Sequence, residues 1–578
     1  MSSQNTIPRR VIPYSENDME DAIKVFKAKK IPVFEPGEDD YERYIATANL
    51  IYRFSSPHCV VRPKCACDVR DIIKTAKPRR IPITIKNGGH SYAGGSTTNI
   101  GILMELGLMN EVDLDRNSET VTVKGGALWF HVYKELVSNH LDGYVVNGGR
   151  CPTVGVSGFM LGGGLSPFTR SFGMGCDTVR EFSIVTADGD ELTVSDRDNP
   201  TSDKGKLFWA LRGAGGGNFG VVIEMKLSLM KLKSNVVVAG RYTWFPERES
   251  MDAFMTTMNG FYTRNWSNEM TLDSTWLCDL SNTKTDLAVR FLVYYNGTRE
   301  SFDQEINSWT PNNSPQHAEL KKQLKRRSMQ EKSSRFLHET LAAQWVEETK
   351  KSFPTNRSYQ IYTSFVFRNN RRDIEQVTSI IRDEMRAFRE LFVGEAAILQ
   401  VTFIHSGGAA NFKKRQDTAF RWRRSIYHAY IMIQWDEKWL EMNMRGFLER
   451  MKPKLRPAGM VQGATFINFP DASLKPDAHE KSYYGNNHQE LRRIKKIWDK
   501  DNYFSWPQGI QLPGGNLTRS GSIDADESEN FVGDLLTTRA FTANEEELTD
   551  ALAELHWESY RPSTRRSYVN GALPALVS

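Results

Sequence analysis

The sequence predicts an α+β fold in two domains, the second built on a large antiparallel sheet covered by helices. At 578 residues the chain is too long for one domain with a single hydrophobic core, because domains usually span about 100–200 residues. Up to about residue 235, segments of strand and helix character mix without the regular alternation of a Rossmann sheet. Beyond that point, long alternating strands are interspersed with charged helices, which is typical of a sheet with helices on one face.

The first half of the chain is predicted to begin with a polar arm that lies on the surface over residues 1–38. A short helix follows, with its N-terminal cap near Asp68, and a β-rich strand at 81–85 leads directly into glycines. Residues 182–194 form a predicted hairpin, in which Asp188-Gly189 supplies the positive φ of a tight turn. The other elements expected here are strands at 102–106, 120–123 and 221–229, and a helix over about 127–140.

The second half is predicted to contain strands at 287–295, 358–367 and 427–435 and a charged helix at 371–392. A strand has a side-chain period of two, so alternate residues share a face. The residues of the last strand that are expected on one face are His428, Tyr430, Met432 and Gln434.

The composition is ordinary for a soluble globular enzyme. Hydrophobic residues make up 39% and charged residues 25% of the chain, which is ordinary for globular proteins. The net charge of +5 gives no electrostatic support for a nucleic-acid partner. No apolar run reaches the ~18 residues of a membrane span, so no membrane partner is predicted.

The N-terminus lacks the apolar segment of a secretory signal, so an intracellular location is expected, or a secreted one if a leader was removed. The glycosylation triplets that keep secretion open begin at Asn265, Asn296, Asn356 and Asn516.

Six cysteines are too few for a disulfide scaffold. The pair Cys65-x-Cys67 has no second Cys or His pair nearby, which is poor zinc spacing, so no metal site is predicted. Buried thiols are expected for Cys59, Cys65, Cys67, Cys176 and Cys278. Only Cys151, which lies among glycines, is a candidate for a chemical role.

Two glycine-rich stretches indicate a ligand site: residues 87–95 hold His90, and residues 149–164 hold Cys151. Glycine lets backbone N–H groups approach a ligand closely, and consecutive exposed N–H groups form a nest for anionic oxygens. Two such clusters, with a histidine and a cysteine, are stronger evidence than one. No Gly-x-Gly-x-x-Gly opens a helix after the first strand, which argues against a nicotinamide cofactor.

The pairing of Gly88-Gly-His90-Ser-Tyr92 with Cys151-Pro-x-Val-Gly-x-x-Gly-x-x-x-Gly-Gly-Gly164 resembles the berberine-bridge-enzyme-like flavoprotein oxidases. These have the vanillyl-alcohol-oxidase, or PCMH, type of FAD-binding fold. The resemblance continues at 207–220 and 483–487 and covers about residues 40–512. It implies FAD bonded covalently to His90 at the C8 methyl group and to Cys151 at ring carbon 6.

The resemblance also implies the domain limits. An FAD domain would comprise residues 1–235 and the return segment 460–512, and a substrate domain would comprise residues 236–459. Residues 513–578 form an extension of unknown role, expected to be helical over 545–558.

By the resemblance, backbone N–H groups of residues 87–91 would hold the pyrophosphate, helped by residues 155–164. Ordinary turn glycines and a packed tyrosine remain the alternatives. The residues expected to contact FAD are Asn87, Gly88, Gly89, His90, Ser91, Gly94, Cys151, Val154, Gly155, Gly158, Gly162, Gly163, Asn218, Gly220, Val221, Tyr484 and Asn487.

This chain differs from its relatives in the residue at the position of the catalytic base. As hydride leaves the substrate for the flavin, a base must take the proton of the neighbouring O–H or N–H. Many relatives carry Asn-Tyr-x-Asp with tyrosine in that role or assisting it, whereas this chain has Asn468-Phe469-Pro-Asp471. Phenylalanine has no ionisable proton, so Phe469 cannot be the base.

The strand at 427–435 offers replacements, because relatives from plants carry Glu or Gln at its substrate-facing positions, matched here by His428 and Tyr430. Histidine, titrating near ~6.5, is better poised at neutral pH than a phenol near ~10. His428 is therefore predicted as the base with Tyr430 assisting, although a strand histidine buried for packing is an equal alternative. Tyr92 matches a substrate-facing tyrosine of the family.

Two further positions, Phe159 and Val154, bear on the chemistry of the flavin. Phe159 stands where plant members have a histidine, so the negative charge of the reduced ring must be stabilised from elsewhere. Val154 matches the family's oxygen gate, at which valine accompanies fast use of oxygen. An oxidase that makes hydrogen peroxide is therefore favoured over a dehydrogenase.

The function predicted from these residues is FAD-dependent oxidation of an alcohol or amine-type C–H centre in a small molecule, either a secondary metabolite or a carbohydrate. Its partners would be that substrate and molecular oxygen, and the oligomeric state is left open. The alternatives are an oxidative cyclase, a flavin-binding protein with little turnover, and a nicotinamide-dependent reductase of related fold.

Overall fold

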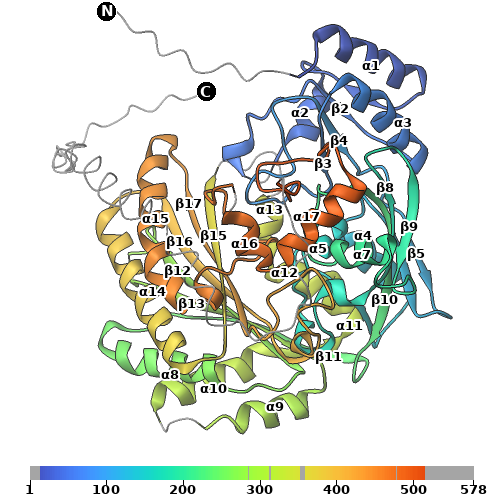
Figure 1. Cartoon of the computed structure of the whole chain (residues 1–578). Coiled ribbons are helices and arrows are strands. Elements are labelled where there is room, and N and C mark those ends of the chain that lie inside the picture. Colours follow the sequence, from blue (N-terminus) through green and yellow to red (C-terminus); the bar gives the residue numbers. More distant parts are fainter. Residues whose placement is uncertain are drawn as a thin grey trace, which may run out of the picture. The chain divides into compact units, whose positions relative to one another are not determined.

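The computed structural model describes residues 13–47, 49–283, 285–310, 314–351, 358–476 and 478–514. Within those ranges, no helix is both long and apolar enough to cross a membrane. The helix predicted at 545–558 lies outside the described residues. The described strands form three sheets (Figure 1).

The first sheet leads into the first glycine loop. Its strand order is β1-β2-β4-β3, and its pairs are parallel except for β1 with β2. Strand β3 ends directly before Asn87, so the loop leaves the sheet at a strand end. The strands are β1 (Val33–Phe34), β2 (Cys59–Val61), β3 (Ile83–Lys86) and β4 (Ile102–Glu105).

The second sheet is antiparallel, in the order β5-β6-β10-β8-β9, with β7 paired to β10. The predicted hairpin is confirmed, because β8 pairs with β9 and Gly189 has φ +78° in the turn between them. The strands are β5 (Val112–Asp115), β6 (Thr120–Lys124), β7 (Tyr144–Val146), β8 (Val179–Val185), β9 (Glu191–Ser195) and β10 (Val221–Lys231).

The third sheet is the large antiparallel sheet predicted for the second half, in the order β14-β11-β13-β12-β16-β17-β15. Helices α14 and α15 run alongside its strands (Figure 1). The strands are β11 (Val236–Trp244), β12 (Met270–Asp279), β13 (Ala288–Tyr295), β14 (Ser328–Lys332), β15 (Tyr359–Phe367), β16 (Ala397–His405) and β17 (Tyr427–Trp435).

Strand β17 alternates between the two faces of this sheet, as its sequence predicts. Tyr427, Ile431 and Trp435 belong to the core that the sheet shares with helices α8, α14 and α15. Tyr430 and Met432 instead belong to a separate cluster on the opposite face. That opposite face is the one turned towards the site described below.

The helices flank the sheets, and their bounds are close to those predicted where a prediction was made. Those of the first half are α1 (Glu16–Ala28), α2 (Asp39–Ile45), α3 (Ala66–Ala76), α4 (Trp129–Ser138), α5 (Val156–Leu161), α6 (Thr169–Phe172) and α7 (Asp203–Leu211). Those of the second half are α8 (Met251–Thr263), α9 (Arg299–Asn307), α10 (Pro315–Arg327), α11 (Ser333–Arg335), α12 (Leu341–Gln344), α13 (Val346–Lys351), α14 (Arg371–Leu391), α15 (Glu441–Leu455), α16 (Ala478–Tyr484) and α17 (Asn487–Trp498).

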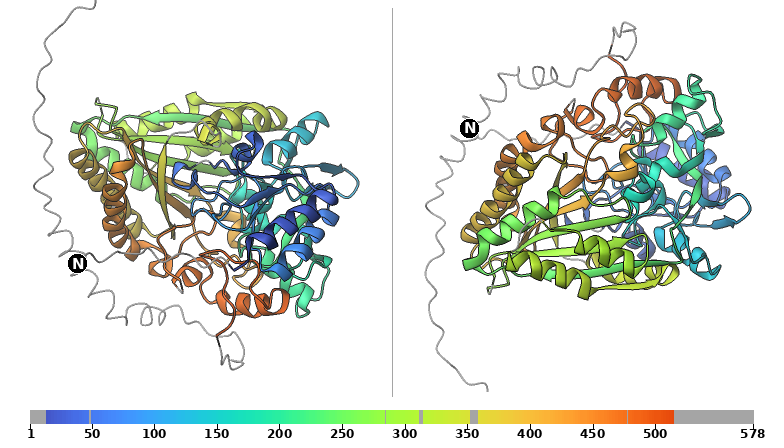
Figure 2. Two further views of the ribbon diagram at one scale, coloured as in Figure 1. Left: turned by 90° about the horizontal axis from the view of Figure 1, so that it is seen from above. Right: turned by 90° about the horizontal axis from the view of Figure 1, so that it is seen from below.

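The segment that contains α16 and α17 packs against the first half of the chain. Leu491 and Ile494 of α17 join the core formed by the second sheet and α7. The Lys495 ammonium, fully buried, donates to the Asn218 carbonyl at 2.6 Å and pairs with Asp499 at 2.7 Å. The orange-to-red ribbon accordingly lies beside cyan elements of the first half (Figure 2).

The prediction of a polar surface arm at the N-terminus is wrong for the described part of residues 1–38. Helix α1 starts with a capping box between Ser15 and Asp18. It buries Met19, Ala22 and Phe26, which recur at helical spacing. The segment is therefore an amphipathic helix that packs into the core.

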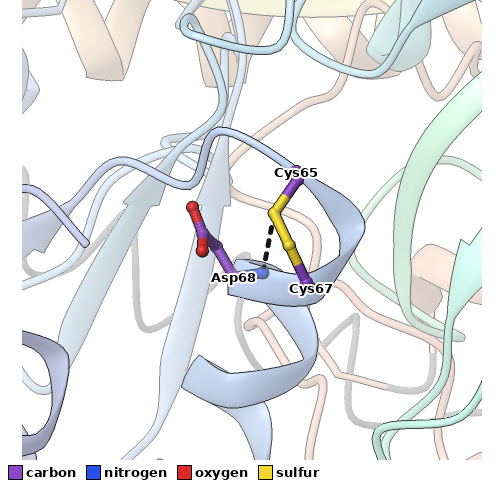
Figure 3. A group of neighbouring side chains, drawn as sticks. All are labelled: Cys65, Cys67 and Asp68. Atoms are coloured by element: carbon purple, nitrogen blue, oxygen red, sulfur yellow. Dashed lines mark hydrogen bonds between the residues drawn. A yellow bond between two sulfur atoms is a disulfide. The ribbon is translucent and has the colours of Figure 1, made fainter. Parts of the chain in front are cut away.

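The prediction of buried thiols is wrong for Cys65 and Cys67, which form a disulfide (Figure 3). Neither is buried, and Cys67 is exposed. Cys65 also caps α3, because the backbone N–H of Asp68 donates to its sulfur at 3.3 Å. Together with Asp68, these cysteines form the only group of candidate metal ligands within the described ranges, and the disulfide leaves neither sulfur as a thiolate. Cys59, Cys176 and Cys278 are buried and free, as predicted.

Candidate active site

A cavity of about 300 Å³ lies where the predicted glycine loops meet the face of the third sheet that carries Tyr430 and Met432. Most of the residues predicted from sequence line it. These are Asn87, Gly88, Gly89, His90, Ser91, Tyr92, Cys151, Val154, Gly155, Gly158, Gly220 and Tyr430.

The two glycine loops touch each other, which only glycine allows at residue 88. A Cβ there would lie 2.6 Å from both the backbone nitrogen of Gly155 and the carbonyl oxygen of Thr153. Those distances are far inside van der Waals contact, so any side chain would force the loops apart. Gly88 therefore brings the loop of His90 against the loop of Cys151.

His90 and Cys151 contact the same hydroxyl group. His90 Nε2 and Thr153 Oγ1 share a hydrogen bond of 3.0 Å, and Cys151 Sγ lies 3.3 Å from the same oxygen. Both residues line the cavity, and Cys151 is 8% exposed. The imidazole and the thiol thus lie close enough together to face one planar ligand.

Asn87 anchors the first loop and leaves one acceptor available. Its Nδ2 donates to the Gly125 carbonyl at 2.8 Å and to Ser157 Oγ at 2.9 Å. Its Oδ1 is buried and has no hydrogen-bond partner among the described residues. Buried polar atoms are normally paired, so this oxygen suits a ligand that donates a hydrogen bond.

Glycines 215–217 form a third loop that lines the cavity, although only its neighbours Asn218 and Gly220 were predicted. Asn218 shapes this loop and does not line the cavity. Its Nδ2 donates to the Ala214 carbonyl at 3.0 Å, and its Oδ1 accepts from the Ile510 N–H at 3.0 Å. The run of three glycines was the signal for this loop.

These loops leave open space on the side of the cavity. A Cβ at Gly158 would meet no atom within 4 Å, and one at Gly217 would meet only Trp506, at 3.7 Å. Since both residues line the cavity, their missing side chains leave space that belongs to it. Open glycine walls, the Asn87 acceptor and the neighbouring imidazole and thiol fit FAD.

Seven of the residues predicted to contact FAD do not line this cavity: Gly94, Gly162, Gly163, Asn218, Val221, Tyr484 and Asn487. They hold the loops from behind. The Tyr484 hydroxyl donates to the Ala214 carbonyl at 2.7 Å, and Val221 is fully buried in a core cluster. A Cβ at Gly162 would collide with the Asn468 side chain. Contact of these seven residues with FAD therefore stays a prediction.

His428 is fully buried and is not among the described residues that line the cavity, which is evidence against its predicted role as base. Its Nε2 shares a hydrogen bond of 2.9 Å with Ser425 Oγ, and its ring packs on Phe420 and Phe466. Burial, with a smaller effect from the Arg423 guanidinium, lowers the pKa of His428 to about 3. The packing alternative left open by the sequence fits this position better.

The neutral state of His428 predicts a pH dependence of stability. Its pKa is lower in the folded protein than the ~6.5 of an unfolded chain, so its contribution is complete above pH ~6.5 and is lost as the pH falls towards 3. We expect His428→Gln to remove a slope of up to about 1.4 kcal/mol per pH unit in this window. The measurement is the free energy of urea unfolding at pH 7 and pH 5. Exposed His338→Gln is the control, and equal slopes in both variants would contradict the prediction.

Tyr430 reaches the cavity from the same strand face. Gln400 Nε2 donates to its hydroxyl oxygen at 3.3 Å and to Thr402 Oγ1 at 2.9 Å. The Tyr430 and Phe469 ring centres lie 5.0 Å apart, so Phe469 occupies the wall beside this hydroxyl. Of the two predicted strand residues, Tyr430 is thus the one that lines the cavity.

Arg150 is a cavity residue that the sequence did not reveal. Its Nε donates to Asp273 Oδ2 at 2.5 Å and its Nη2 to Oδ1 at 3.1 Å, in a buried ion pair. The partner lies 123 positions away on β12, so no local pattern could have indicated it. This pair ties the Cys151 loop to the third sheet.

Comparison with family models gives two matches. Residues 57–195 match the FAD binding domain, and residues 465–511 match the family described as berberine and berberine like.

Two of the similar proteins are named as an oxidoreductase and an oxidase. FAD-linked oxidoreductase ZEB1 of Gibberella zeae is 27% identical over 470 residues, which cover 79% of this chain and 76% of the relative. (R)-6-Hydroxynicotine oxidase of Paenarthrobacter nicotinovorans is 32% identical over 202 residues, covering 35% of this chain and 42% of the relative.

Solved structures share the fold. Berberine bridge enzyme from Eschscholzia californica has a TM-score of 0.72 at 19% identity, with 86% of this chain and all of the other covered. Chitooligosaccharide oxidase has a TM-score of 0.70 at 18% identity, with 85% of this chain and all of the other covered.

The fold, the family matches and the named relatives define the chain as an FAD-linked oxidoreductase with a PCMH-type FAD-binding fold. Residues 465–511 are berberine-bridge-enzyme-like, as the sequence motifs predicted, and the fold is similar to that of berberine bridge enzyme.

Proposed function

We propose that this protein is an oxidase that removes a hydride from a C–H centre of a small organic alcohol or amine-type substrate. FAD would be bonded covalently to both His90 and Cys151, and molecular oxygen would be reduced to hydrogen peroxide. When bound, FAD supplies the acceptor for the two electrons. The observation that carries the proposal is that one hydroxyl, Thr153 Oγ1, contacts both the imidazole and the thiol, and that both of these groups line a glycine-walled cavity.

The proton that leaves with the hydride goes to Tyr430 in this proposal. Hydrogen bonding to the ionised form of a group favours that form. The N–H of Gln400 donates to the Tyr430 oxygen, so it stabilises the phenolate and makes the oxygen a better acceptor. Tyr92, which also lines the cavity, positions the substrate beside it. The names of relatives, which include oxidases of an oligosaccharide and of hydroxynicotine, support a small organic substrate.

The test is a panel of alcohols, amines, phenolics and sugars mixed with the flavin-loaded protein without oxygen. Bleaching of the flavin absorbance by at least one compound, followed by peroxide formation when oxygen is admitted, is the expected result. A flavin that stays yellow with all of them, yet is reduced by light, would favour a binding protein with little turnover. The mass of the product separates simple oxidation from oxidative cyclisation.

Val154 is the residue we propose to admit oxygen, because it lines the cavity three positions after Cys151. Val154→Leu adds a methylene group to this wall and should slow re-oxidation about tenfold, which corresponds to ~1.4 kcal/mol of barrier. Reduction by substrate should change little. The measurement is stopped-flow re-oxidation of the reduced protein, with Val393→Leu, 74% exposed, as the control. Equal re-oxidation rates in wild type and Val154→Leu would refute the gate.

A further inference from the structure

Aromatic side chains from separate segments form one wall of the cavity. Tyr92 follows the His90 loop, Tyr430 lies on β17, and Phe469 comes from the return segment. The ring centres of Tyr92 and Phe469 are 6.0 Å apart with planes within 18°, and Tyr430 lies 5.0 Å from Phe469 and 6.0 Å from Tyr92. These are the distances of packed aromatic pairs, so the three rings form one continuous surface, here called the aromatic wall.

The Tyr92 ring is held in place from outside the cavity. Tyr362 stacks on it with centres 3.7 Å apart and planes within 6°. The Tyr362 hydroxyl donates to Gln360 Oε1 at 2.7 Å, and both residues are buried. A ring fixed on its rear face presents a preformed flat surface, which lowers the entropic cost of binding another flat ring.

The cavity offers no counter-charge for an ionic substrate. None of the described residues that line it is Asp, Glu or Lys. The one guanidinium, that of Arg150, is already neutralised by Asp273. The pyrophosphate of FAD would be held by backbone N–H groups of the glycine loops. A charged group of a substrate placed against the aromatic wall would instead lose its hydration with no charged side chain to compensate, so the substrate is expected to be neutral there.

Two polar side chains near the aromatic wall already have hydrogen-bond partners. The indole N–H of Trp345 donates to the Tyr294 hydroxyl at 3.0 Å, and Asn468 Nδ2 donates to the Phe159 carbonyl at 2.9 Å. Each sugar hydroxyl that is buried without a partner would weaken binding. Aromatic carbon, by contrast, gains from contact with these rings.

We propose that the substrate presents a neutral, planar aromatic ring to the aromatic wall, with the oxidisable carbon attached to that ring. This inference rests on the proposed oxidase function. For an arylmethanol the balance is complete: the alcohol loses one hydride and one proton to become the aldehyde, and oxygen gains both to become hydrogen peroxide. Carbohydrates and alkylammonium compounds are therefore expected to bind this wall less tightly.

The experiment compares four probes on the flavin-loaded protein without oxygen. They are 2-naphthalenemethanol, its fully saturated decalin analogue, 2-naphthylmethylammonium and cellobiose. Affinity is measured by calorimetry and reduction by loss of flavin absorbance. We expect 2-naphthalenemethanol to bind about tenfold more tightly than the decalin analogue, and the other two to bind more weakly still.

Equal affinity for the naphthalene and decalin compounds, or tighter binding of the ammonium compound or cellobiose, would overturn the inference. The two proposals fail in different ways. Tight binding of 2-naphthalenemethanol with no reduction by any compound would count against the oxidase and leave the aromatic site standing. Reduction by cellobiose alone would support the oxidase and overturn the aromatic site.

A variant of the wall provides a second measurement. Phe469→Leu keeps an apolar side chain but removes the ring, so the dissociation constant of 2-naphthalenemethanol should rise about threefold to tenfold, with little change for the decalin analogue. Phe412→Leu makes the same change at a residue that is 76% exposed and should alter neither constant. Equal weakening of both ligands by Phe469→Leu would show that the wall provides only apolar contact and does not favour aromatic ligands.

Discussion

Replacing both His90 and Cys151 by alanine is expected to leave all of the flavin in solution when the protein is precipitated with acid. Either single replacement should retain flavin on the pellet, because each keeps one of the two proposed bonds. The physical reason is the geometry at Thr153, whose hydroxyl contacts both side chains and so places them beside one ring. Absorbance of the supernatant and of the redissolved pellet measures the result.

The matched control for the cysteine is Cys176→Ala. Cys176 is fully buried and is not among the described residues that line the cavity, so its replacement should leave the flavin attached. Free flavin from the wild-type protein would contradict both assignments. Retention of flavin by the double variant would instead place the bond on another residue.

Local patterns were enough to predict nine of the 17 described strands and three of the 17 described α-helices. The period of two in β17 placed Tyr430 and His428 on one face correctly, and Asp188-Gly189 marked a real turn. Where the expectation failed at the N-terminus, the signal was present but unused, since Ser15 and Asp18 have the spacing of a capping box.

The candidate site was predictable only in part, because a shared face does not mean a shared environment. His428 and Tyr430 point the same way, yet Ser425 and Phe466 cover the histidine while Tyr430 reaches the cavity. The distance in sequence between Arg150 and Asp273 likewise hides their pairing. Contacts of this kind are set by tertiary packing, which periodicity does not report.

Tyr430→Phe should slow reduction of the flavin by substrate about 10²–10⁴-fold, which is the usual contribution of a positioned proton acceptor. Re-oxidation by oxygen should be unchanged, because no substrate proton moves in that step. The ring is kept, so packing against Phe469 survives and only the hydroxyl that Gln400 contacts is lost. The measurement is the anaerobic rate of flavin bleaching with a saturating substrate as a function of pH. Any rise of this rate with pH in wild type should be absent in the variant, which has no hydroxyl to accept the proton.

Tyr427→Phe is the matched control, since Tyr427 lies on the same strand but faces the helix-covered core, where its hydroxyl donates to the Tyr262 carbonyl at 3.2 Å. It should cost some stability and leave the rate of reduction and its pH profile unchanged. His428→Ala distinguishes the two candidate bases. If that variant removes the pH dependence while Tyr430→Phe retains it, the histidine accepts the proton, and its burial in the resting protein must be relieved when substrate binds.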